Sequence, residues 1–452
     1  MSRQSFPLVA HRSLDDVIAY REGQAVTVRR FLAEVTRVRQ VLGAGTHILN
    51  LCGDRYRFMV GLAAALVSGK TSLLPSSSTP AMLRSLANFA PDILCLIDGG
   101  LAGIGLPQVA YPEDERIDSD DGVPLIDGAL TAAYVFTSGS TGQPEPHAKT
   151  WGSLVRNVRA EATRLGMDAG QRHTLIGTVP PQHMYGFEST VLLAMQSGAS
   201  ISAGRQFYPF DICAAIAAAP RPRMLVSTPL HLRALMVDGL DVPPVDKLLS
   251  ATAPISLDLV REAERRFDAP LLEIYGCTES GQVASRQPVI SPQWRLFPGL
   301  RLAWENGRAW VSGGHVDGRV ELGDLLEPVD GECFLLHGRT ADLVNIAGIR
   351  SSLAYLNHQL NMIPGVRDGI FFMPDGECSD RVTRLTAFVV APDLDAASLT
   401  RALRERVHPA FLPRPLLFVD ALPRNATGKL PREALHALAE GRAKQTGGGA
   451  CR

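Results

Sequence analysis

The sequence predicts an α/β protein of two domains: a large N-terminal domain with mixed, largely parallel sheets, and a small C-terminal α+β domain. Three observations predict it. The chain has 452 residues, whereas a single hydrophobic core stops growing near ~250–300 residues. Short apolar runs alternate with helical patterns through the first three quarters, which is typical of parallel sheets. From about Glu332 the pattern changes to mixed strands and helices that suit a separate small domain.

The N-terminal elements follow one another as buried strands and helices. Strands are expected at ILNLCG, TSLLP and DILCLIDG, and helices at FMVGLAAALVSG and AMLRSLANFA. In the C-terminal part, ECFLLHGR, GIFFM and LTAFVV predict strands, and SLAYLNHQL, SLTRALRERVH and PREALHALAE predict helices. Pro431 at the first turn and Gly441 past the end bound the last helix. The predicted domains are residues 1–340 and 341–452, with the junction between Arg339 and Asp342.

Composition and charge exclude several classes. A net charge of −1 gives no overall field toward nucleic acid or anionic membrane, so no nucleic-acid partner is expected. Seven cysteines stand singly without a CxxC pair, which argues against a secreted disulfide framework. The first residues lack the apolar region of a signal peptide, and the most apolar stretch falls short of the ~20 residues that span a bilayer. A cytoplasmic protein without a membrane span is therefore expected.

The sharpest local signal is YVFTSGSTGQP, residues 134–144. An apolar strand runs directly into a Ser/Thr/Gly loop that can bind an anion through backbone N–H groups and hydroxyls. Its residues are Thr137, Ser138, Gly139, Ser140, Thr141 and Gly142. The spacing differs from that of a P-loop. A flexible Ser/Gly linker is the alternative, but the strand before it and the helical WGSLVRNVRAEATRL after it favour a structured phosphate-binding loop.

TSGSTG-x-P resembles the phosphate-loop signature of the adenylate-forming (AMP-binding) superfamily, which includes acyl-CoA synthetases, peptide-synthetase adenylation domains and luciferases. Five further segments resemble the superfamily's other signatures, in the same order, over about Tyr134 to Leu435. They are PPQHMYGFE, SATAPIS, IYGCTESG, LGDLLEPVDGECFLLHGR and LPRNATGKLPREAL. The resemblance implies an adenylate-forming N-terminal domain, a mobile C-terminal domain, and ATP and Mg²⁺ as cofactors.

The resemblance also assigns roles in nucleotide binding. Tyr275 would stack on adenine, Gly276 would allow close backbone approach, and Thr278 would contact the α-phosphate. Glu279 supplies the hard oxygen ligand that Mg²⁺ prefers. Asp324 and Arg339 would bind the ribose and phosphates, and Lys429 would bring positive charge from the small domain to the reacting groups. In isolation, a Thr-Glu pair or a loop lysine is more often an ordinary surface feature.

For the acid and the thiol the resemblance is less detailed. His183, which we also count among the catalytic residues with Lys429, Thr278 and Glu279, would line the carboxylate site. The predicted substrate pocket comprises His183, Tyr185, Gly186, Pro229 and Cys277. A lone histidine would more often pack in a core. After a rotation of the small domain about the junction at 339–342, Gly348 would leave room for a pantetheine chain.

Two departures from the family pattern stand out. Glu145 follows Pro144 where the family has a lysine, so Lys149 or His147 is the candidate replacement. At the junction, Ala341 stands where a charged residue is common, with Asp342 beside it.

The predicted function is ATP-dependent activation of an aryl or fatty acid as acyl-AMP, followed by transfer to coenzyme A or to an acyl carrier protein. No aspartate suited to an α-amino group follows the phosphate loop, which disfavours amino acids. Several segments resemble a short bacterial subgroup that supplies acyl units to carrier proteins, for example in aryl polyene synthesis. The alternative is a catalytically impaired homologue that binds nucleotide or has a regulatory role.

Overall fold

The structure, a computed structural model, describes residues 4–75, 77–99, 105–112, 122–138, 144–167, 172–204, 206, 208–237, 239–339, 343–346, 349–373, 385–425, 428, 430–431 and 433–439. The chain forms two compact units. The first comprises residues 1–302 and 311–320, and the second comprises residues 303–310 and 321–452. The predicted junction at 340–342 lies outside the described residues, so the domain boundary stays a prediction.

The first unit contains a six-stranded sheet in the order β10-β9-β5-β4-β6-β7. All its neighbouring strands are parallel except the antiparallel pair β9 and β10. The strands are β4 (His47–Asn50), β5 (Thr71–Leu74), β6 (Leu94–Ile97), β7 (Gln108–Ala110), β9 (Thr131–Ser138) and β10 (Pro144–Thr150). The strands predicted from ILNLCG, TSLLP and DILCLIDG are confirmed.

Helices cover both faces of this sheet. Leu49 of β4 points to a cluster with Leu83 and Leu86 of α3 (Pro80–Phe89). Asn50, the next residue, points to the other face, where its amide donates to the carbonyl of Phe58 in α2 (Arg55–Val67). This alternation is the period of two that a strand imposes. α1 (Val28–Val41) packs beside α2.

The second sheet of this unit has the order β17-β16-β15-β14-β13-β11-β12-β2-β3. Its centre, from β12 to β15, is parallel. The strands are β2 (Val17–Arg21), β3 (Gln24–Thr27), β11 (Thr174–Gly177), β12 (Ser200–Ser202), β13 (Arg223–Ser227), β14 (Lys247–Ser250), β15 (Leu271–Cys277), β16 (Gly281–Arg286) and β17 (Trp294–Leu296). β1 (Ser5–Pro7) and β8 (Leu125–Asp127) pair separately.

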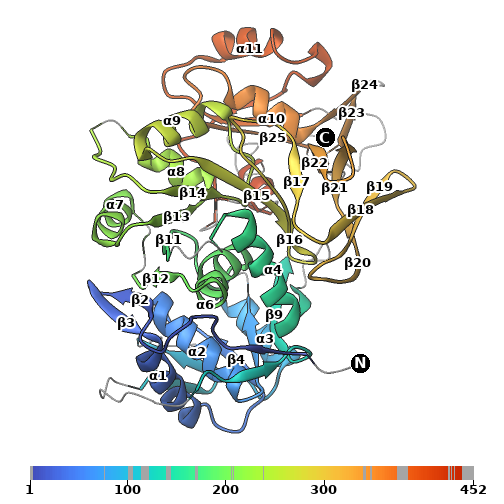
Figure 1. Ribbon diagram of the computed structural model, residues 1–452. Coiled ribbons are helices and arrows are strands. Elements are labelled where there is room, and N and C mark those ends of the chain that lie inside the picture. Colours follow the sequence, from blue (N-terminus) through green and yellow to red (C-terminus); the bar gives the residue numbers. More distant parts are fainter. Residues whose placement is uncertain are drawn as a thin grey trace. The chain divides into compact units, whose positions relative to one another are not determined.

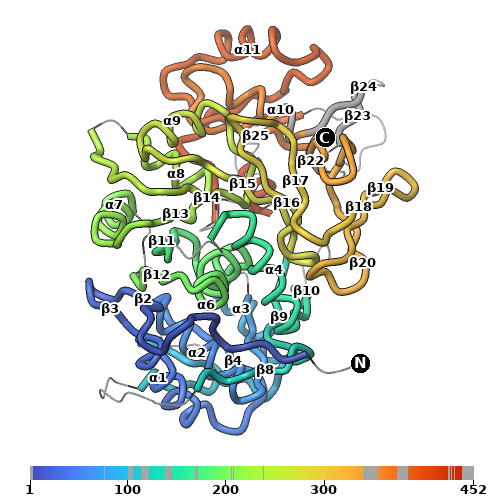
Figure 2. Tube along the Cα trace, viewed as in Figure 1, coloured from blue at the N-terminus to red at the C-terminus, as the bar shows by residue number. Residues whose placement is uncertain are grey.

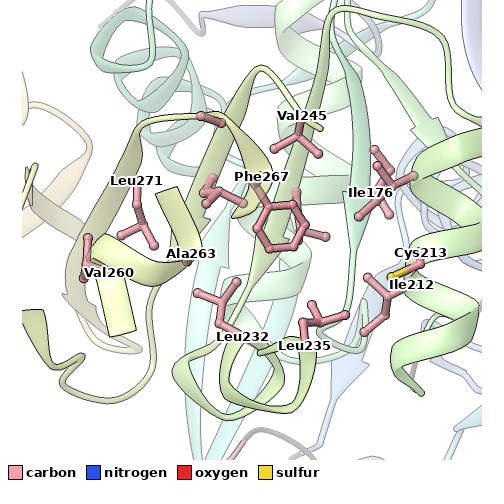
Figure 3. Close-up of a cluster of buried hydrophobic side chains, with 14 of the residues drawn as sticks. Ile176, Ile212, Cys213, Leu232, Leu235, Val245, Val260, Ala263, Phe267 and Leu271 are labelled. Atoms are coloured by element: carbon pink, nitrogen blue, oxygen red, sulfur yellow. The ribbon is translucent and has the colours of Figure 1, made fainter. Parts of the chain in front are cut away.

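Three helices pack on one face of the second sheet: α7 (Pro209–Ala218), α8 (Pro229–Leu235) and α9 (Leu257–Phe267). Figure 3 shows Phe267 of α9 among side chains from the other two helices and from the strands. α8 begins at Pro229 after the N-cap Thr228, and α9 begins after the N-cap Ser256, as helix starts prefer.

On the other side of the second sheet lie α4 (Trp151–Arg164) and the continuous segment α5 (Met184–Gly186), η1 (Phe187–Leu192) and α6 (Leu193–Ser197). α4 contacts β10 of the first sheet and β16 of the second, and η1 contacts β11. These green segments therefore lie between the two sheets (Figure 1). η1 is a π-helix, a rare form that often marks a functional site.

The second unit contains the hairpin of β21 (Asp324–Pro328) and β22 (Cys333–Arg339) and that of β23 (Leu343–Ile346) and β24 (Ile349–Ser352). A three-stranded sheet of β25 (Asp368–Phe372), β26 (Thr386–Val390) and β27 (Leu416–Phe418) is covered by α10 (Leu353–Asn361) and α11 (Ala396–Arg404). Phe372 and Phe388 face the other side, toward Leu435 in the helical residues 433–439. These strands and helices match the mixture of elements that the sequence predicted for a small α+β domain.

Three strands, β18 (Leu300–Glu305), β19 (Arg308–Gly313) and β20 (Val316–Leu322), form a meander where the chain passes between the units. A short 3₁₀ turn, η3 (Pro409–Phe411), follows α11. Among the described residues no helix is long and apolar enough to cross a membrane.

Candidate functional site

The phosphate-loop sequence connects two antiparallel strands. Thr137 pairs with Glu145 and Ser138 pairs with Pro144, where β9 ends and β10 begins (Figure 2). Gly139, Ser140, Thr141 and Gly142 lie outside the described residues. The sequence did not reveal β10, because PEPHAKT is polar and carries two prolines. Such a strand fits at a sheet edge, where β10 lies.

Two side chains of β10 point to the turn that follows β15. His147 and Lys149 are two residues apart along the strand and so lie on the same face. His147 Nε2 lies 3.0 Å from Thr137 Oγ1 and 3.8 Å from Glu279 Oε1. Lys149 Nζ donates to the backbone carbonyl oxygen of Glu279 at 2.8 Å. Both candidate replacements for the missing loop lysine therefore contact the predicted metal ligand.

The turn between β15 and β16 consists of Cys277 to Gly281. A Cβ on Gly276 would collide with the carbonyl oxygen of Gly281, so the close approach of the two strands requires glycine there. Thr278 is half-buried and Glu279 is exposed. Tyr275, just before the turn, packs edge-on against Trp294 with ring centroids 5.8 Å apart. The turn thus presents Thr278 and Glu279 outward from a rigid hairpin.

Electrostatics favours an ionised Glu279. Partial burial works against the charge, but hydrogen bonds from its own backbone N–H and from Cys277, and the charges of His147 and Lys149, hold the pKa of Glu279 below its usual value. Burial raises the pKa of the Cys277 thiol to about 11, so this thiol stays protonated at neutral pH. The turn therefore offers a carboxylate and a hydroxyl, the groups that suit a metal ion and a phosphate.

A polar pocket of about 120 Å³ lies against this turn. Its polar lining comes from β10, α4, η1, the turn itself, the loop before β20 and the start of β20. These residues include Lys149, Asn157, Glu188, Glu279, His315 and Asp317. At this size the pocket accommodates a few water molecules or part of a ligand, since drug-sized sites measure ~300–1,000 Å³.

Two carboxyl groups lie buried behind the pocket. Burial raises the pKa of Glu188 to about 8, although Lys149 opposes the shift, and raises the pKa of Glu161 to about 7. Burial lowers the pKa of Lys149, whereas Glu188 and other nearby groups oppose that change. Asn157 donates a hydrogen bond to Glu188. A buried polar network therefore underlies the Thr278–Glu279 turn.

The second predicted motif forms the start of α5 and η1. His183 is the N-cap residue of α5 and is half-buried, whereas Tyr185 is buried. A Cβ on Gly186 would collide with the carbonyl oxygen of Pro180, so glycine is required there too. Burial raises the pKa of Tyr185 well above its usual value, so its hydroxyl stays neutral. These residues stay predictions for the acid pocket.

A second polar cluster lies at the carboxyl ends of β11 and β13. His231 Nδ1 lies 3.1 Å from Thr178 Oγ1 and 3.0 Å from Thr228 Oγ1, and Thr178 Oγ1 lies 3.1 Å from Ser227 Oγ. All four are buried, and burial lowers the pKa of His231. Pro229, a predicted pocket residue, starts the helix that carries His231. We call Thr178, Ser227, Thr228 and His231 the neutral cluster.

The remaining predicted residues belong to the second unit. Asp324 and Arg339 are partners in the register of β21 and β22, so the hairpin brings these two ribose candidates together. Lys429 and Gly348, and likewise Ala341 and Asp342, lie outside the described residues, so their roles stay predictions.

Sequence reasoning missed several residues around the turn. Glu188 ends the PPQHMYGFE segment but did not stand out, and Asn157 looked like an ordinary polar residue of a helix. His315 gave no motif signal. A different sign lies in SATAPIS, where Thr252 adopts φ of 79°. A β-branched residue there is a strained backbone outlier of the kind that clusters at functional sites.

The chain is similar to known proteins in sequence and in fold. Residues 9–302 match the model of a family described as AMP-binding enzyme. The chain is 30% identical over 312 residues to a 4-coumarate–CoA ligase of Halorhodospira halophila, and 28% identical over 304 residues to that of Rhodobacter capsulatus. Each alignment covers 66% of this chain and 75% of the relative.

Among solved structures, O-succinylbenzoate coenzyme A synthetase of Bacillus subtilis has the same fold. In complex with its acyl-adenylate intermediate it gives a TM-score of 0.81 at 20% identity, covering 96% of this chain and 98% of that one. The same synthetase with ATP and magnesium gives 0.79 at 19% identity, covering 94% and 97%.

Proposed function

Because the chain belongs to the family of AMP-binding enzymes, we propose that it uses ATP and Mg²⁺ to convert a carboxylic acid into an acyl-adenylate. The acyl group then passes to the thiol of coenzyme A or of an acyl carrier protein's phosphopantetheine. One observation carries the proposal. His147 and Lys149 join the strand that follows the predicted phosphate loop to the Thr278–Glu279 turn, which supports a single site for the phosphates and the metal ion.

The donor set fits Mg²⁺ bound to ATP. Glu279 is an exposed carboxylate with a lowered pKa, and Mg²⁺ is usually held by one or two carboxylates together with substrate phosphates and water. Within the described residues no group of three or more His, Cys, Asp or Glu side chains could enclose a metal ion. A metal that arrives with the nucleotide suits such a site. When bound, it would neutralise phosphate charge.

In the first half-reaction a carboxylate oxygen of the acid attacks the α-phosphorus of ATP. The new bond joins the acid to AMP, and the bond to the β-phosphate breaks to release pyrophosphate. The chain's part is positioning and charge neutralisation. Thr278 would donate a hydrogen bond to the α-phosphate, Glu279 would hold the metal ion, and Lys429 would bring its charge to the carboxylate and the α-phosphate.

In the second half-reaction the thiol sulfur attacks the acyl carbon, AMP leaves, and the thiol proton passes to solvent. Rotation of the predicted C-terminal domain, residues 341–452, would exchange Lys429 for the segment around Gly348. Asp324 and Arg339 would bind the ribose throughout.

For the acid we propose an aryl or fatty acid. The two relatives described above act, by name, on 4-coumarate, an aryl acid, which favours the aryl class. His183, Tyr185, Gly186, Pro229 and Cys277 are the proposed lining. A cytoplasmic location accords with a thiol acceptor but stays a prediction.

Pyrophosphate exchange into ATP tests the first half-reaction. We expect exchange that depends on an acid from a panel of aryl, fatty and amino acids, with aryl or fatty acids active. Repeating the active acids with coenzyme A and with holo-carrier protein identifies the acceptor from the thioester formed. No exchange with any acid, together with tight ATP binding, would overturn the proposal in favour of a nucleotide-binding homologue without ligase activity.

A further inference from the structure

Three buried side chains from three different elements lie beneath the turn that carries Glu279. Lys149 comes from β10, Asn157 from α4 and Glu188 from η1, and they are 8%, 2% and 3% exposed. We call Lys149, Asn157 and Glu188 the platform. The sequence assigns neither Asn157 nor Glu188 to a segment that touches ATP. For Lys149 it offers only the hypothesis that this residue binds pyrophosphate.

The platform contacts the turn at two points. Lys149 Nζ donates to the carbonyl oxygen of Glu279 at 2.8 Å. At the end of the turn, Gly281 has φ of 76°, and a Cβ there would lie 3.0 Å from Asn157 Nδ2 and 3.2 Å from Glu188 Oε1. Glycine is therefore required where the turn passes over the Asn157–Glu188 hydrogen bond. The platform fixes both the middle and the end of the turn.

The ammonium group of Lys149 is held at the base of the turn. Around it lie the carboxyl groups of Glu188, Glu279 and Asp317 and the thiol of Cys277. A charged donor to a carbonyl forms a short, strong hydrogen bond, and a buried environment strengthens it. With its ammonium buried and bonded to a backbone carbonyl, Lys149 is badly placed to hold pyrophosphate in solvent.

We propose that Lys149 is a positioning residue for the metal site: it holds the carbonyl of Glu279 and thereby orients the Glu279 carboxylate toward Mg²⁺, with Glu188 as its buried neighbour. This inference rests on the proposed function. It replaces the idea that Lys149 binds pyrophosphate, since Lys149 acts from below the turn through the backbone. Groups that orient a metal ligand typically change metal affinity or activity ~10–100-fold.

The first test is Lys149→Met, which keeps the length and removes the donor. We expect Mg²⁺-dependent ATP binding, measured by calorimetry over a range of Mg²⁺ concentrations, to weaken about tenfold or more. The half-saturating Mg²⁺ concentration for pyrophosphate exchange should rise to the same degree, while the KM for the acid stays within about twofold. Lys70→Met is the matched control, since Lys70 is also buried and its ammonium donates to backbone carbonyls, at Gly43 and Gly45.

The second test separates positioning from simple stability. Lys149→Met removes the charge that opposes the raised pKa of Glu188, so this pKa should rise further and thermal stability at neutral pH should fall. The double variant Lys149→Met/Glu188→Gln has no buried ionisable carboxyl at this position, so stability should recover. The Mg²⁺ requirement should not recover, because the carbonyl of Glu279 still lacks its donor.

Two results would overturn the inference: a normal Mg²⁺ dependence in Lys149→Met, or a Mg²⁺ dependence that recovers together with stability in the double variant. Wild-type protein that binds ATP with Mg²⁺ but exchanges no pyrophosphate would overturn the proposed function alone, because the binding measurement still tests Lys149. Wild-type protein that fails to bind ATP at any Mg²⁺ concentration would overturn both.

Discussion

The platform and the neutral cluster are both buried and polar, yet they differ in charge. The platform combines an ammonium and a carboxyl, Lys149 and Glu188, and bonds outward to the carbonyl of Glu279. The neutral cluster consists of hydroxyls and the imidazole of His231, which lie within hydrogen-bond distance of one another. One is built around charges directed to a turn, and the other around neutral groups directed to one another.

This difference indicates different tasks. Buried charge is costly unless it is paired, so it persists where something must be held in place or kept ionised. The platform lies under the exposed carboxylate of Glu279, where charge must be stabilised. The neutral cluster lies at the carboxyl ends of parallel strands, where ligands commonly bind in open α/β sheets. If the acid binds there, neutral side chains would suit an acyl group that carries no charge of its own.

Arg55 connects the two regions, and its loss should have the largest effect on stability. Its guanidinium is 4% exposed and donates at 2.8 Å each to the carbonyls of Gly177 and Val179, on either side of Thr178, and to Thr190 Oγ1 of η1. Burial lowers its pKa to about 10, so it stays charged at neutral pH. Arg55→Met should lower the free energy of unfolding of the first unit by roughly 4 kcal/mol, because three buried acceptors lose their donor.

Denaturant unfolding measures this cost, with Arg261→Met as control. Arg261 lies on the exposed face of α9 with a 65% exposed side chain and a loose ion pair of 3.9 Å, and its loss should change stability by less than about 0.5 kcal/mol. Equal costs for the two variants would mean that Arg55 does not join the clusters energetically.

The buried carboxyl of Glu161 should make the stability of the protein depend on pH. Burial raises its pKa from 4.5 to about 7, so the folded protein keeps this proton while the unfolded chain has lost it. The stability linked to Glu161 is therefore fully present below pH 4.5 and is lost as pH rises to about 7. Glu161→Gln should be more stable than wild type by up to ~3 kcal/mol at pH 8, with little difference near pH 4.5. Urea unfolding at the two pH values measures it, and an equal difference at both would contradict the shift.

Substitution of Glu279 tests the exposed carboxylate that lies above the platform. Glu279→Gln keeps the size and removes the metal-binding charge, and should lower the rate of acid-dependent pyrophosphate exchange about a hundredfold, equivalent to ~2.7 kcal/mol. Glu145→Gln is the control, since Glu145 is exposed on β10 near the loop and stands where the family has a lysine. Its removal should leave the rate within about threefold. A large loss in both variants would indicate a general effect of charge near the loop.

The sequence predicted the α/β fold, and the family comparison confirms the adenylate-forming assignment made from six ordered motifs. Apolar strands such as TSLL in β5 and capped helices such as α3 could be predicted because burial and capping leave local sequence patterns. Asn157, Glu188 and His315 were not, because their importance comes from contacts between residues far apart in the chain. β10 was missed because its pairing with β9, rather than its own composition, makes it a strand.

Thr178 gives the smallest expected effect and tests the neutral cluster alone. Thr178→Val keeps the shape of the side chain and removes the hydroxyl that lies between Ser227 Oγ and His231 Nδ1. The free energy of unfolding should therefore fall by ~1 kcal/mol. Thr174→Val, at the opposite end of β11, removes a hydroxyl that accepts from Ser200 Oγ and should cost a similar amount. Only Thr178→Val should change the KM for the acid, by a few-fold, and neither should change the Mg²⁺ dependence. A shift in Mg²⁺ dependence with Thr178→Val would mean that the two buried regions act as one.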